Sequence, residues 1–468
     1  MSSKAMPLLE TANSEIAPES FGEIPAAKVV PRTTYVDKTP LPFEEIPGPA
    51  ILKLWEKYWR YVPLLGTQLF CSLLISRLGS QGRLSWNRNI TPIKYLFNEY
   101  GCVVRINGPL VNDIVMIHRP EHIAEVFKQE SKSPVRSGID ILQHYRLNHH
   151  KYRFAGPFSL QGSEWLKKRK KVPQPLHETI SNHVGKLDMI CDELINRIRN
   201  IRNRQDEVCV SKYVWNEYIF IPFFLNIFNN MDYNIYSLLD KRDEYMLQPN
   251  TINVKCFLIT TQNKLQTSSQ EERSVNEEKS SPLLEKMMLQ RIHSDDISTL
   301  LMDMMILGVQ AIVNCEAFLL YFLAKNPRVQ RLLYDEAISV SSKTGSALTT
   351  ESLEDMPYLK ACVKESLRLR PAFPYLTRLL SSPITLHGYT IPKGTFVIMA
   401  NEIMSQREEL FEDPEKYRPE RWLNQNEHVH QEYSYLPFGG GVRSCLGKDL
   451  AEIQMMLLTA KVNEFCIQ

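Results

Sequence analysis

The sequence predicts a mainly helical fold of the α+β class, in which one long central helix accompanies small β-sheets. Three observations support this prediction. Residues 295–325 show a helical pattern about 31 residues long. Short apolar segments of strand length occur within residues 102–120 and 384–401. Charged sequence with a helical pattern fills most of residues 164–204.

The composition is that of a globular protein with a large buried core, because 43% of the 468 residues are hydrophobic and 23% are charged. The 55 basic and 53 acidic residues leave a formal net charge of +2, which gives no general attraction to nucleic acid or anionic lipid. We therefore expect no nucleic-acid partner. The nine cysteines are scattered without a CxxC pair, so the sequence indicates neither a zinc site nor a disulfide framework. A reducing compartment fits best.

Two domain-level features are predicted. Residues 1–42 are polar and rich in proline, which favours an extended leader or tail that can be disordered, and residues 43–468 are predicted to form one domain. The leader carries four glutamates, whereas a mitochondrial transit peptide is rich in arginine and poor in acid, so no clear import signal is present.

The apolar stretches at 61–75 and 218–228 are too short to span a bilayer, which takes about 20 residues. Residues 260–281 read as a flexible loop.

The first regular elements are a hairpin and a helix. The segments "CVVRING" (102–108) and "DIVMIHRP" (113–120) alternate apolar and polar residues and are predicted to pair as short strands. Pro120 then opens a helix over residues 120–130, where apolar residues recur at spacings of three and four.

The long helix has clear limits. Ser294 can cap its start, Asp295 and Asp296 suit its positive N-terminal end, and Pro327 stops it. At 1.5 Å per residue it is about 45 Å long, enough to cross a domain. Apolar residues run nearly all round its middle, residues 300–323, so we predict that it is buried.

Later elements follow in order. Residues 353–371 are predicted to form a shorter helix closed by proline. Strands with turns at Gly388 and residues 392–394 are predicted within residues 384–401. A final helix follows Gly447.

The segment "PFGGGVRSCLGKDLAE" (437–452) carries the strongest chemical signal. Three glycines before Cys445 allow the backbone to lie close against a flat ligand, and a helix that begins after Cys445 directs amide dipoles at its sulfur. Such donors stabilise a thiolate, which is the axial ligand that favours O–O cleavage on haem iron. The alternative reading is a buried structural cysteine in a glycine-rich turn.

The pattern F-x-x-G-x-R-x-C-x-G decides between these readings. It is met in full by Phe438, Gly441, Arg443, Cys445 and Gly447, and it resembles the haem-binding signature of the cytochromes P450. The resemblance implies the haem-thiolate fold, haem b (iron protoporphyrin IX) as cofactor and Cys445 as the iron ligand, with Arg443 able to pair with a haem propionate.

Other positions extend the resemblance. Glu365 and Arg368 resemble the family's E-x-x-R pair, and Arg421 in "YRPERW" resembles the third member of its Glu–Arg–Arg network; alone, the first two would read as a surface pair. The resemblance also implies haem-propionate contacts for a further set: Trp165, Arg169 and Arg378.

The mitochondrial branch of the family is indicated by "FEEIPGP" (43–49), by "VRSGIDILQHYR" (135–146) and above all by Lys360 and Lys364. These two lysines resemble that branch's docking pair for an acidic iron–sulfur ferredoxin, which an NADPH-dependent reductase reduces; the alternative is two solvated lysines on a helix face. The resemblance further implies a monomer held peripherally at the matrix side of the mitochondrial inner membrane. The run "KKRKK" (167–171) is predicted to add to the same basic face.

One motif departs from the family pattern. The oxygen-activating motif [AG]-G-x-[DE]-T-[ST] aligns at Gly308, but Gln310 replaces the acid and Ala311 replaces the threonine. An amide and a methyl group cannot form an acid–alcohol proton relay. Water or a substrate hydroxyl could supply the protons, the chemistry could proceed without dioxygen scission, or the protein could be a degenerate haem binder.

The sequence therefore predicts a monooxygenase that hydroxylates a lipophilic small molecule, a sterol or xenobiotic, with O2 and electrons from a ferredoxin. The alternative is a catalytically degenerate haem-binding or sensing protein. Compared with the family, the domain is expected to be shortened between residues 215 and 292 and at its C-terminal end, where the substrate pocket would be enclosed.

Overall fold

The computed structural model describes residues 40–50, 53, 92–107, 113–136, 140–149, 155–171, 173–201, 283–344, 348–423 and 431–467. The predicted leader before residue 40, the apolar stretches, the loop at 260–281 and the pocket segment from 215 to 282 lie outside these residues. The described residues form many helices and two small sheets, so the predicted fold class is confirmed.

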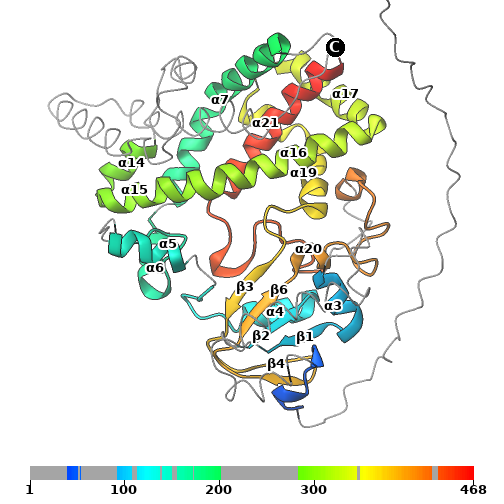
Figure 1. Ribbon diagram of the computed structural model, residues 1–468. Helices are drawn as coiled ribbons and strands as arrows, with labels where there is room; N and C mark the ends of the chain where they lie inside the picture. Colours follow the sequence, from blue (N-terminus) through cyan, green and yellow to red (C-terminus); the bar gives the residue numbers. More distant parts are fainter. Residues whose placement is uncertain are drawn as a thin grey trace, which may run out of the picture. The chain divides into compact units, whose positions relative to one another are not determined.

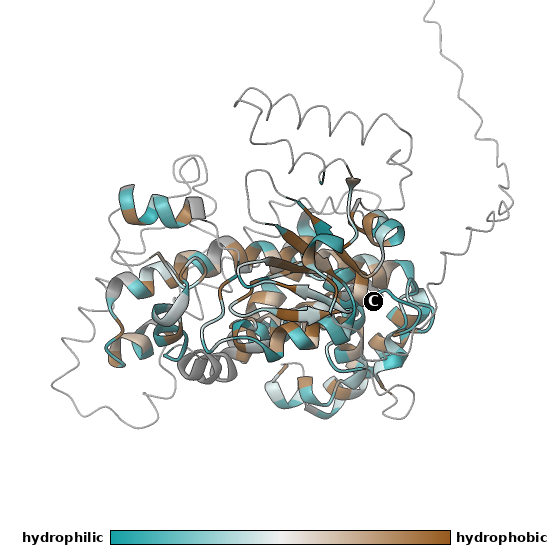
Figure 2. Ribbon diagram, turned by 90° about the horizontal axis from the view of Figure 1, so that it is seen from below, coloured by the Kyte–Doolittle hydropathy of each residue, from teal (hydrophilic) through white to brown (hydrophobic). Residues whose placement is uncertain are grey.

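A four-stranded sheet is formed by β1 (Val103–Ile106), β2 (Ile114–Ile117), β6 (Phe396–Met399) and β3 (Leu376–Leu379), in that order. The β1–β2 hairpin is antiparallel, with Val103 opposite Ile117, which confirms the predicted hairpin. Strand β6 pairs in parallel with β2 and antiparallel with β3. Segments far apart in the sequence thus form one sheet, and its strands carry many hydrophobic residues, as Figure 2 shows.

A second sheet is the hairpin of β4 (Ile384–Leu386) and β5 (Tyr389–Ile391). Its turn places His387 at φ 50° and Gly388 at φ 82°. Two positive φ values suit the tight hairpin turn that follows the twist of paired strands. Helix α4 (Pro120–Lys128) begins at the predicted proline and packs its apolar face on this part of the molecule, burying Ile123 and Val126.

The helical part of the molecule is built around a long rod, which Figure 1 shows running across it. The rod consists of α15 (Ser294–Asp303), a π-helix η6 (Met304–Val309) and α16 (Gln310–Lys325). The long helix is therefore confirmed, with a widened turn in its middle that the sequence did not predict. Helices α7 (Pro173–Ile201), α17 (Pro327–Thr344) and α21 (Lys448–Ile467) pack around it and share its main hydrophobic core.

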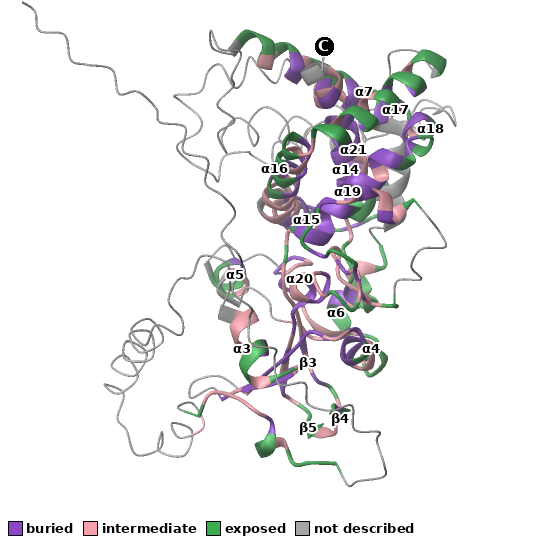
Figure 3. Ribbon diagram, turned by 90° about the vertical axis from the view of Figure 1, so that its right-hand side faces the viewer, coloured by how far each residue is buried: buried purple, intermediate pink, exposed green. Residues whose placement is uncertain are grey.

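The prediction that this helix is buried all round is wrong for α16. Val313, Leu319 and Leu323 are buried against the neighbouring helices, but Phe318 is 41% and Tyr321 50% exposed. Figure 3 shows the exposed turns in green, beside the largely buried α19 and α21. One face of α16 supplies the core, and the opposite face does not. Residues 296–325 are long and apolar enough to cross a membrane by length and composition, a test that core helices also pass.

The predicted helix at 353–371 is two helices. A short helix, α18 (Thr350–Glu354), ends before Pro357, and α19 (Pro357–Leu369) begins at that proline. Glu336 of α17 accepts hydrogen bonds from the backbone N–H groups of Tyr358 and Leu359, both at 2.8 Å. A carboxylate from another helix therefore caps the start of α19.

The remaining elements are short and connect these parts. They are η1 (Phe43–Glu45), α3 (Pro92–Tyr100), α5 (Asp140–His144), η3 (Tyr145–His149), α6 (Gly162–Arg169), α14 (Leu283–Leu289), α20 (Asn401–Met404), η7 (Pro419–Trp422) and η8 (Gly441–Arg443).

Candidate functional site

The loop before α21 presents Cys445 in a fixed conformation. Gly439 and Gly441 have φ values of 73° and 65°, which residues with a side chain rarely adopt. A Cβ on Gly441 would lie 2.5 Å from a carboxylate oxygen of Glu130, so there is no room for one. The Cys445 amide donates to the carbonyl of Phe438 at 2.9 Å. The glycines therefore allow a tight turn that aims the cysteine side chain away from the loop.

The Cys445 thiol is accessible and lines a cavity of about 440 Å³, a typical size for a small-molecule site. Partial burial raises the pKa of Cys445, whereas a hydrogen bond from the Gly447 backbone and the charges of Arg169 and Arg136 lower it. The first effect is the larger one. A bound metal cation would complete the stabilisation of a thiolate here, because coordination deprotonates a thiol outright.

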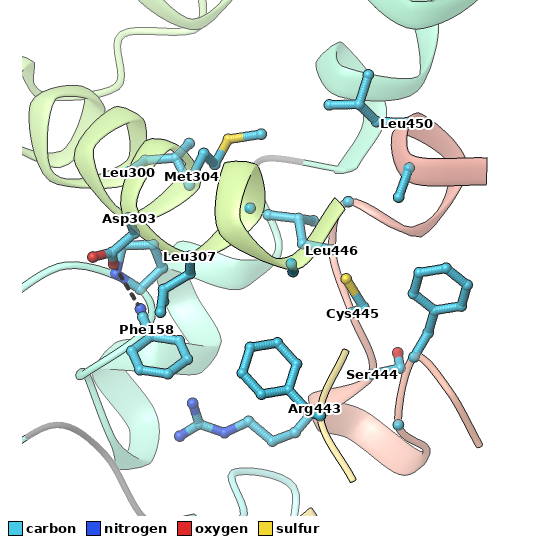
Figure 4. A pocket seen from close by; sticks show the side chains of 18 of the residues that line it. Phe158, Leu300, Asp303, Met304, Leu307, Arg443, Ser444, Cys445, Leu446 and Leu450 are labelled. Carbon is cyan, nitrogen blue, oxygen red and sulfur yellow. Dashed lines mark hydrogen bonds between the residues drawn. The ribbon is translucent and has the colours of Figure 1, made fainter. Parts of the chain in front are cut away.

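The cavity lies between the cysteine loop, the long helix and β3. Figure 4 shows Leu300, Met304 and Leu307 on the helix side, and Cys445 and Leu446 on the loop side. Apolar side chains form much of this wall. An apolar enclosure with the thiol at one side suits a flat, largely hydrophobic ligand.

Four arginines line the same cavity: Arg136, Arg169, Arg378 and Arg443. Burial and the charges of the other three lower the pKa of Arg443 to about 9. Burial and Arg378 also lower the pKa of Arg136, whose buried Nε has no hydrogen-bond partner among the described residues. Clustered cations with an unsatisfied donor favour an anionic ligand. Haem carries two propionates, so the residues present fit this group.

Trp165 and Arg443 contact each other directly. The guanidinium carbon of Arg443 lies 3.7 Å from the centre of the buried Trp165 ring. The Arg443 side chain also donates to the carbonyls of Pro134 at 2.9 Å and Leu160 at 3.2 Å. Trp165 therefore packs beneath an arginine of the cavity wall.

Arg378 and Arg169 hold the cysteine loop from two sides. Arg378 pairs with Glu130 and donates to the carbonyl of Gly440 at 3.0 Å. Arg169, at the end of α6, donates to the carbonyl of Ser444 at 3.0 Å. Both arginines therefore contact the loop backbone and the cavity together.

Sequence reasoning missed Arg136 and Glu130 as site residues. Arg136 lies inside the segment that indicated the mitochondrial branch, but it belongs to none of the motifs used above. Glu130 lies two residues after the end of α4 and accepts from both Arg378 and the Val442 amide, the latter at 3.3 Å. Its role depends on contacts distant in sequence, so no local pattern could have identified it.

The sequence-predicted Glu–Arg–Arg set forms a closed buried network. Arg368 donates to both carboxylate oxygens of Glu365, at 2.9 and 2.8 Å, and Arg421 donates to Glu365 at 3.0 Å. The indole N–H of Trp422 adds a fourth bond at 2.9 Å. All three charged side chains are 0% exposed in these pairs. This is not the surface pair that their spacing alone would suggest.

Two opposing effects act on Glu365. Burial would raise its pKa, but hydrogen bonds and charge from Arg368, together with the charge of Arg421, hold the pKa below its usual value. Arg368 also donates to the carbonyls of Ser405 and Pro414, both at 2.8 Å. The network thus ties α19 to the segment that leads towards η7.

The helix wall lacks the acid–alcohol pair in three dimensions as well. Gly308 and Ala311 line the cavity, whereas Gln310 is not among the described lining residues and donates instead to Asn314 at 3.1 Å. Among the described lining residues of the rod, acids and hydroxyls occur only before η6, at Asp296, Thr299 and Asp303. Asp303 is occupied by an ion pair with Arg146 at 2.6 Å.

Lys360 and Lys364 lie on α19, with Lys360 half-buried and Lys364 exposed. Lys360 donates to the carbonyl of Glu354 at 3.0 Å, and Lys364 lies 5.9 Å from the centre of the Trp422 ring. The basic run at residues 167–171 does not belong to the docking face as a whole. Lys168 pairs with Asp296 and Arg169 faces the cavity, so only part of that run is available to a partner.

A thiol that faces an apolar cavity beside clustered arginines is the arrangement of a haem-thiolate oxidoreductase. The chain belongs to the cytochrome P450 family, which matches residues 74–464. It is 26% identical to probable cytochrome P450 49a1 of Drosophila melanogaster, over 90% of this chain and 77% of that protein. It is 28% identical to 1,25-dihydroxyvitamin D(3) 24-hydroxylase, mitochondrial, of Rattus norvegicus, over 77% of this chain and 74% of that protein.

A third relative is cytochrome P450 302a1, mitochondrial, of Drosophila melanogaster, 26% identical over 90% of this chain and 88% of that protein. These relatives confirm the resemblance to the mitochondrial branch. The protein is thus a mitochondrial-type monooxygenase whose cofactor is haem with a cysteine thiolate ligand.

Proposed function

We propose that the protein hydroxylates a lipophilic small molecule, a sterol or xenobiotic, with O2 and electrons from a ferredoxin, and that Cys445 is the iron ligand. The observation that carries this proposal is the position of Cys445 at the edge of an apolar cavity that four arginines also line. When bound there, haem would supply the activation of dioxygen.

Different residues of the site would bind different parts of the haem. Arg136, Arg169, Arg378 and Arg443 would neutralise the propionates, and Trp165 would keep Arg443 in place through its ring. Gly447, which lines the cavity, would let the loop backbone approach the ring, and Phe438 would close the wall beside it. Gly441 would serve the loop turn itself, since it lies against Glu130. The network of Glu365, Arg368 and Arg421 would keep the segment before the loop in register.

Electrons would arrive at α19. An acidic iron–sulfur ferredoxin, reduced by an NADPH-dependent reductase, would dock against Lys360 and Lys364, and complementary charge would speed this transient encounter. Since α19 also carries Glu365 and Arg368, the docking face lies on the helix that is tied to the haem-loop region.

A sterol-like substrate is supported by two observations. The cavity wall carries large apolar side chains, including Met304, Leu307, Phe373 and Leu376. The rat relative, which is 28% identical, is named as a 24-hydroxylase of 1,25-dihydroxyvitamin D(3). We further propose that the protein works as a monomer at the matrix side of the mitochondrial inner membrane, held peripherally, with residues 1–42 as leader and 43–468 as the enzyme domain.

A catalytically degenerate haem-binding or sensing protein is the second candidate. It is favoured by Ala311 on the cavity wall and by Gln310, which turns to Asn314. The candidate functions differ in product formation. In a system reconstituted with ferredoxin, its reductase, O2 and NADPH, the first predicts a hydroxylated sterol, and the second predicts NADPH consumption with peroxide alone for every lipophile tried.

A further inference from the structure

Three potential metal ligands meet away from the cysteine loop. Cys102 directly precedes β1, His122 lies on α4, and His387 lies in the β4–β5 turn. One ligand atom from each lies within 4.8 Å of the other two. Three separate elements therefore bring a thiol and two imidazoles to one place.

His122 supplies a second, independent observation. Its side chain is 7% exposed, and its buried Nδ1 has no hydrogen-bond partner in the described part of the chain. The rings of His122 and His387 meet edge to face, with centres 5.7 Å apart. A buried ring nitrogen without a partner is unfavourable unless a ligand satisfies it.

Burial, more than the surrounding charges, favours neutral imidazoles in this cluster. Burial lowers the pKa of His122 to about 4 and also lowers that of His387, so both rings offer lone pairs at neutral pH. Arg119 acts in the same direction on both histidines, and Glu121 opposes it. Histidine binds metal ions in this neutral form.

The cysteine starts as a thiol. Burial raises the pKa of Cys102, although Arg119 and Arg407 lower it, and Glu121 adds to the increase. A metal ion must therefore displace the thiol proton, which leaves to solvent as the sulfur–metal bond forms. The nearby arginines repel a free cation, but the new thiolate offsets one charge of a divalent ion.

We propose that Cys102, His122 and His387 bind a Zn²⁺ ion, with water as the fourth ligand. Zinc binds both thiolate sulfur and imidazole nitrogen, and three protein ligands leave an open fourth position for water. Bonds of about 2.3 Å to sulfur and 2.0–2.1 Å to nitrogen require the ligands to close in by roughly 1 Å. His387 is an exposed turn residue and can make this movement.

Bound zinc would join α4 to the β4–β5 hairpin. The other end of α4 supports the cysteine loop, because Phe127 packs against Gly440 and the following Glu130 binds Arg378. A clamp at the start of α4 would therefore stabilise the wall on which the loop rests. Ligand binding to the folded state alone raises its melting temperature.

The experiment uses the haem-loaded protein without a polyhistidine tag, so that Cys445 is already coordinated. Zinc is added, excess is removed by dialysis, and the zinc-to-haem ratio, the zinc K-edge absorption spectrum and Tm are measured. Cys102→Ala and His387→Asn are compared with wild type. Asparagine tolerates the positive φ at 387, so this variant is expected to fold. His293→Ala, which removes an exposed histidine elsewhere, is the control.

We expect one retained zinc per haem, a spectrum of one sulfur and two imidazoles, and a higher Tm for wild type and His293→Ala. Either ligand substitution should weaken zinc binding by more than about 100-fold, since even outer-shell residues contribute about 10–100-fold. The proposal would be overturned if the wild type retained no zinc, or if Cys102→Ala and His387→Asn retained as much zinc as the wild type. Neither result depends on catalytic activity.

Discussion

The guanidinium carbon of Arg443 lies over the indole ring of Trp165, 3.7 Å from the ring centre. An aromatic ring attracts and orients a cation without neutralising it. Arg443 therefore keeps its charge for the cavity while its position is fixed from below. The same arrangement explains why a tryptophan in α6 and an arginine in the cysteine loop, 278 positions apart (443 − 165), act on one site.

Replacing the thiol at 445 tests the identity of the iron ligand. Cys445→Ser should abolish the red-shifted Soret band of the reduced carbon-monoxide complex, because a serine hydroxyl does not provide a thiolate. Cys315→Ala is the matched control, since Cys315 also lines the cavity but lies on α16. A wild-type spectrum in Cys445→Ser would exclude Cys445 as the ligand.

Removing one arginine should loosen haem. If Arg136 binds a propionate as proposed, Arg136→Gln removes a charge-assisted contact, and a loss of about 1.5–3 kcal/mol corresponds to about 10–100-fold weaker retention of haem. Transfer of haem to apomyoglobin measures this. Arg328→Gln removes an arginine that is 82% exposed and should leave the transfer rate unchanged. Equal rates for all three proteins would show that Arg136 does not contact the cofactor.

Breaking the buried network should destabilise the fold. Glu365→Gln leaves Arg368 and Arg421 buried without their counter-charge, which costs about 3–5 kcal/mol. Urea unfolding of the haem-loaded protein measures the change. Glu412→Gln disrupts an ion pair in which Glu412 is 64% exposed, and should change stability by about 0–1 kcal/mol.

The effect of Glu365 should also depend on pH. Because its folded-state pKa is lowered from 4.5, its contribution is fully present above pH 4.5 and is lost as the pH falls through the lower folded value. The stability difference between wild type and Glu365→Gln should therefore shrink on acidification. A difference that grows at acid pH would contradict the assigned direction of the pKa shift.

Charge reversal on α19 should weaken electron delivery. The double substitution Lys360→Glu and Lys364→Glu is expected to raise the KM for reduced ferredoxin roughly 10-fold at low salt, with a smaller effect at high salt. Lys343→Glu reverses an exposed lysine at the end of α17 and serves as the control. If the double variant and the control behave alike, docking occurs on another face.

Restoring the acid–alcohol pair tests the proton relay. Gln310→Asp combined with Ala311→Thr should raise the ratio of hydroxylated product to NADPH consumed, since a positioned general acid typically contributes about 10²–10⁴-fold to a proton-transfer step. Asn314→Asp adds an acid one turn further along without the threonine, and should leave coupling unchanged. An unchanged ratio in the double variant would mean that protons reach the site by another route.

Local sequence patterns predicted the elements whose signals are local. The β1–β2 hairpin, the proline-opened start of α4 and the final helix α21 are confirmed because alternation, proline and glycine act within a few residues. Strand β3 was missed, since it is only four residues long and is completed by pairing with β6. The π-helix η6 contains no residue type that distinguishes it from the adjoining α-helix, so the sequence pattern did not predict it.

The candidate site was predictable only where motifs exist. Cys445, Arg443 and the Glu365 network have fixed spacings, and the structure brings the predicted propionate contacts to one cavity. The zinc cluster has no such spacing. Cys102 and His387 lie in parts of the chain that meet only after the sheets form, which explains why counting cysteines indicated no metal site.

The π-helix η6 sets how far α16 is rotated about the rod axis relative to α15. Each residue of a regular helix turns by about 100°, so removing one residue from η6 would rotate α16 relative to α15 by that amount. Before η6, Asp303 of α15 is fixed by its ion pair with Arg146. After η6, Glu316 of α16 is fixed by a hydrogen bond from the Thr459 hydroxyl at 3.0 Å. The length of the six-residue segment 304–309 therefore determines which side chains of α16 face the Cys445 sulfur.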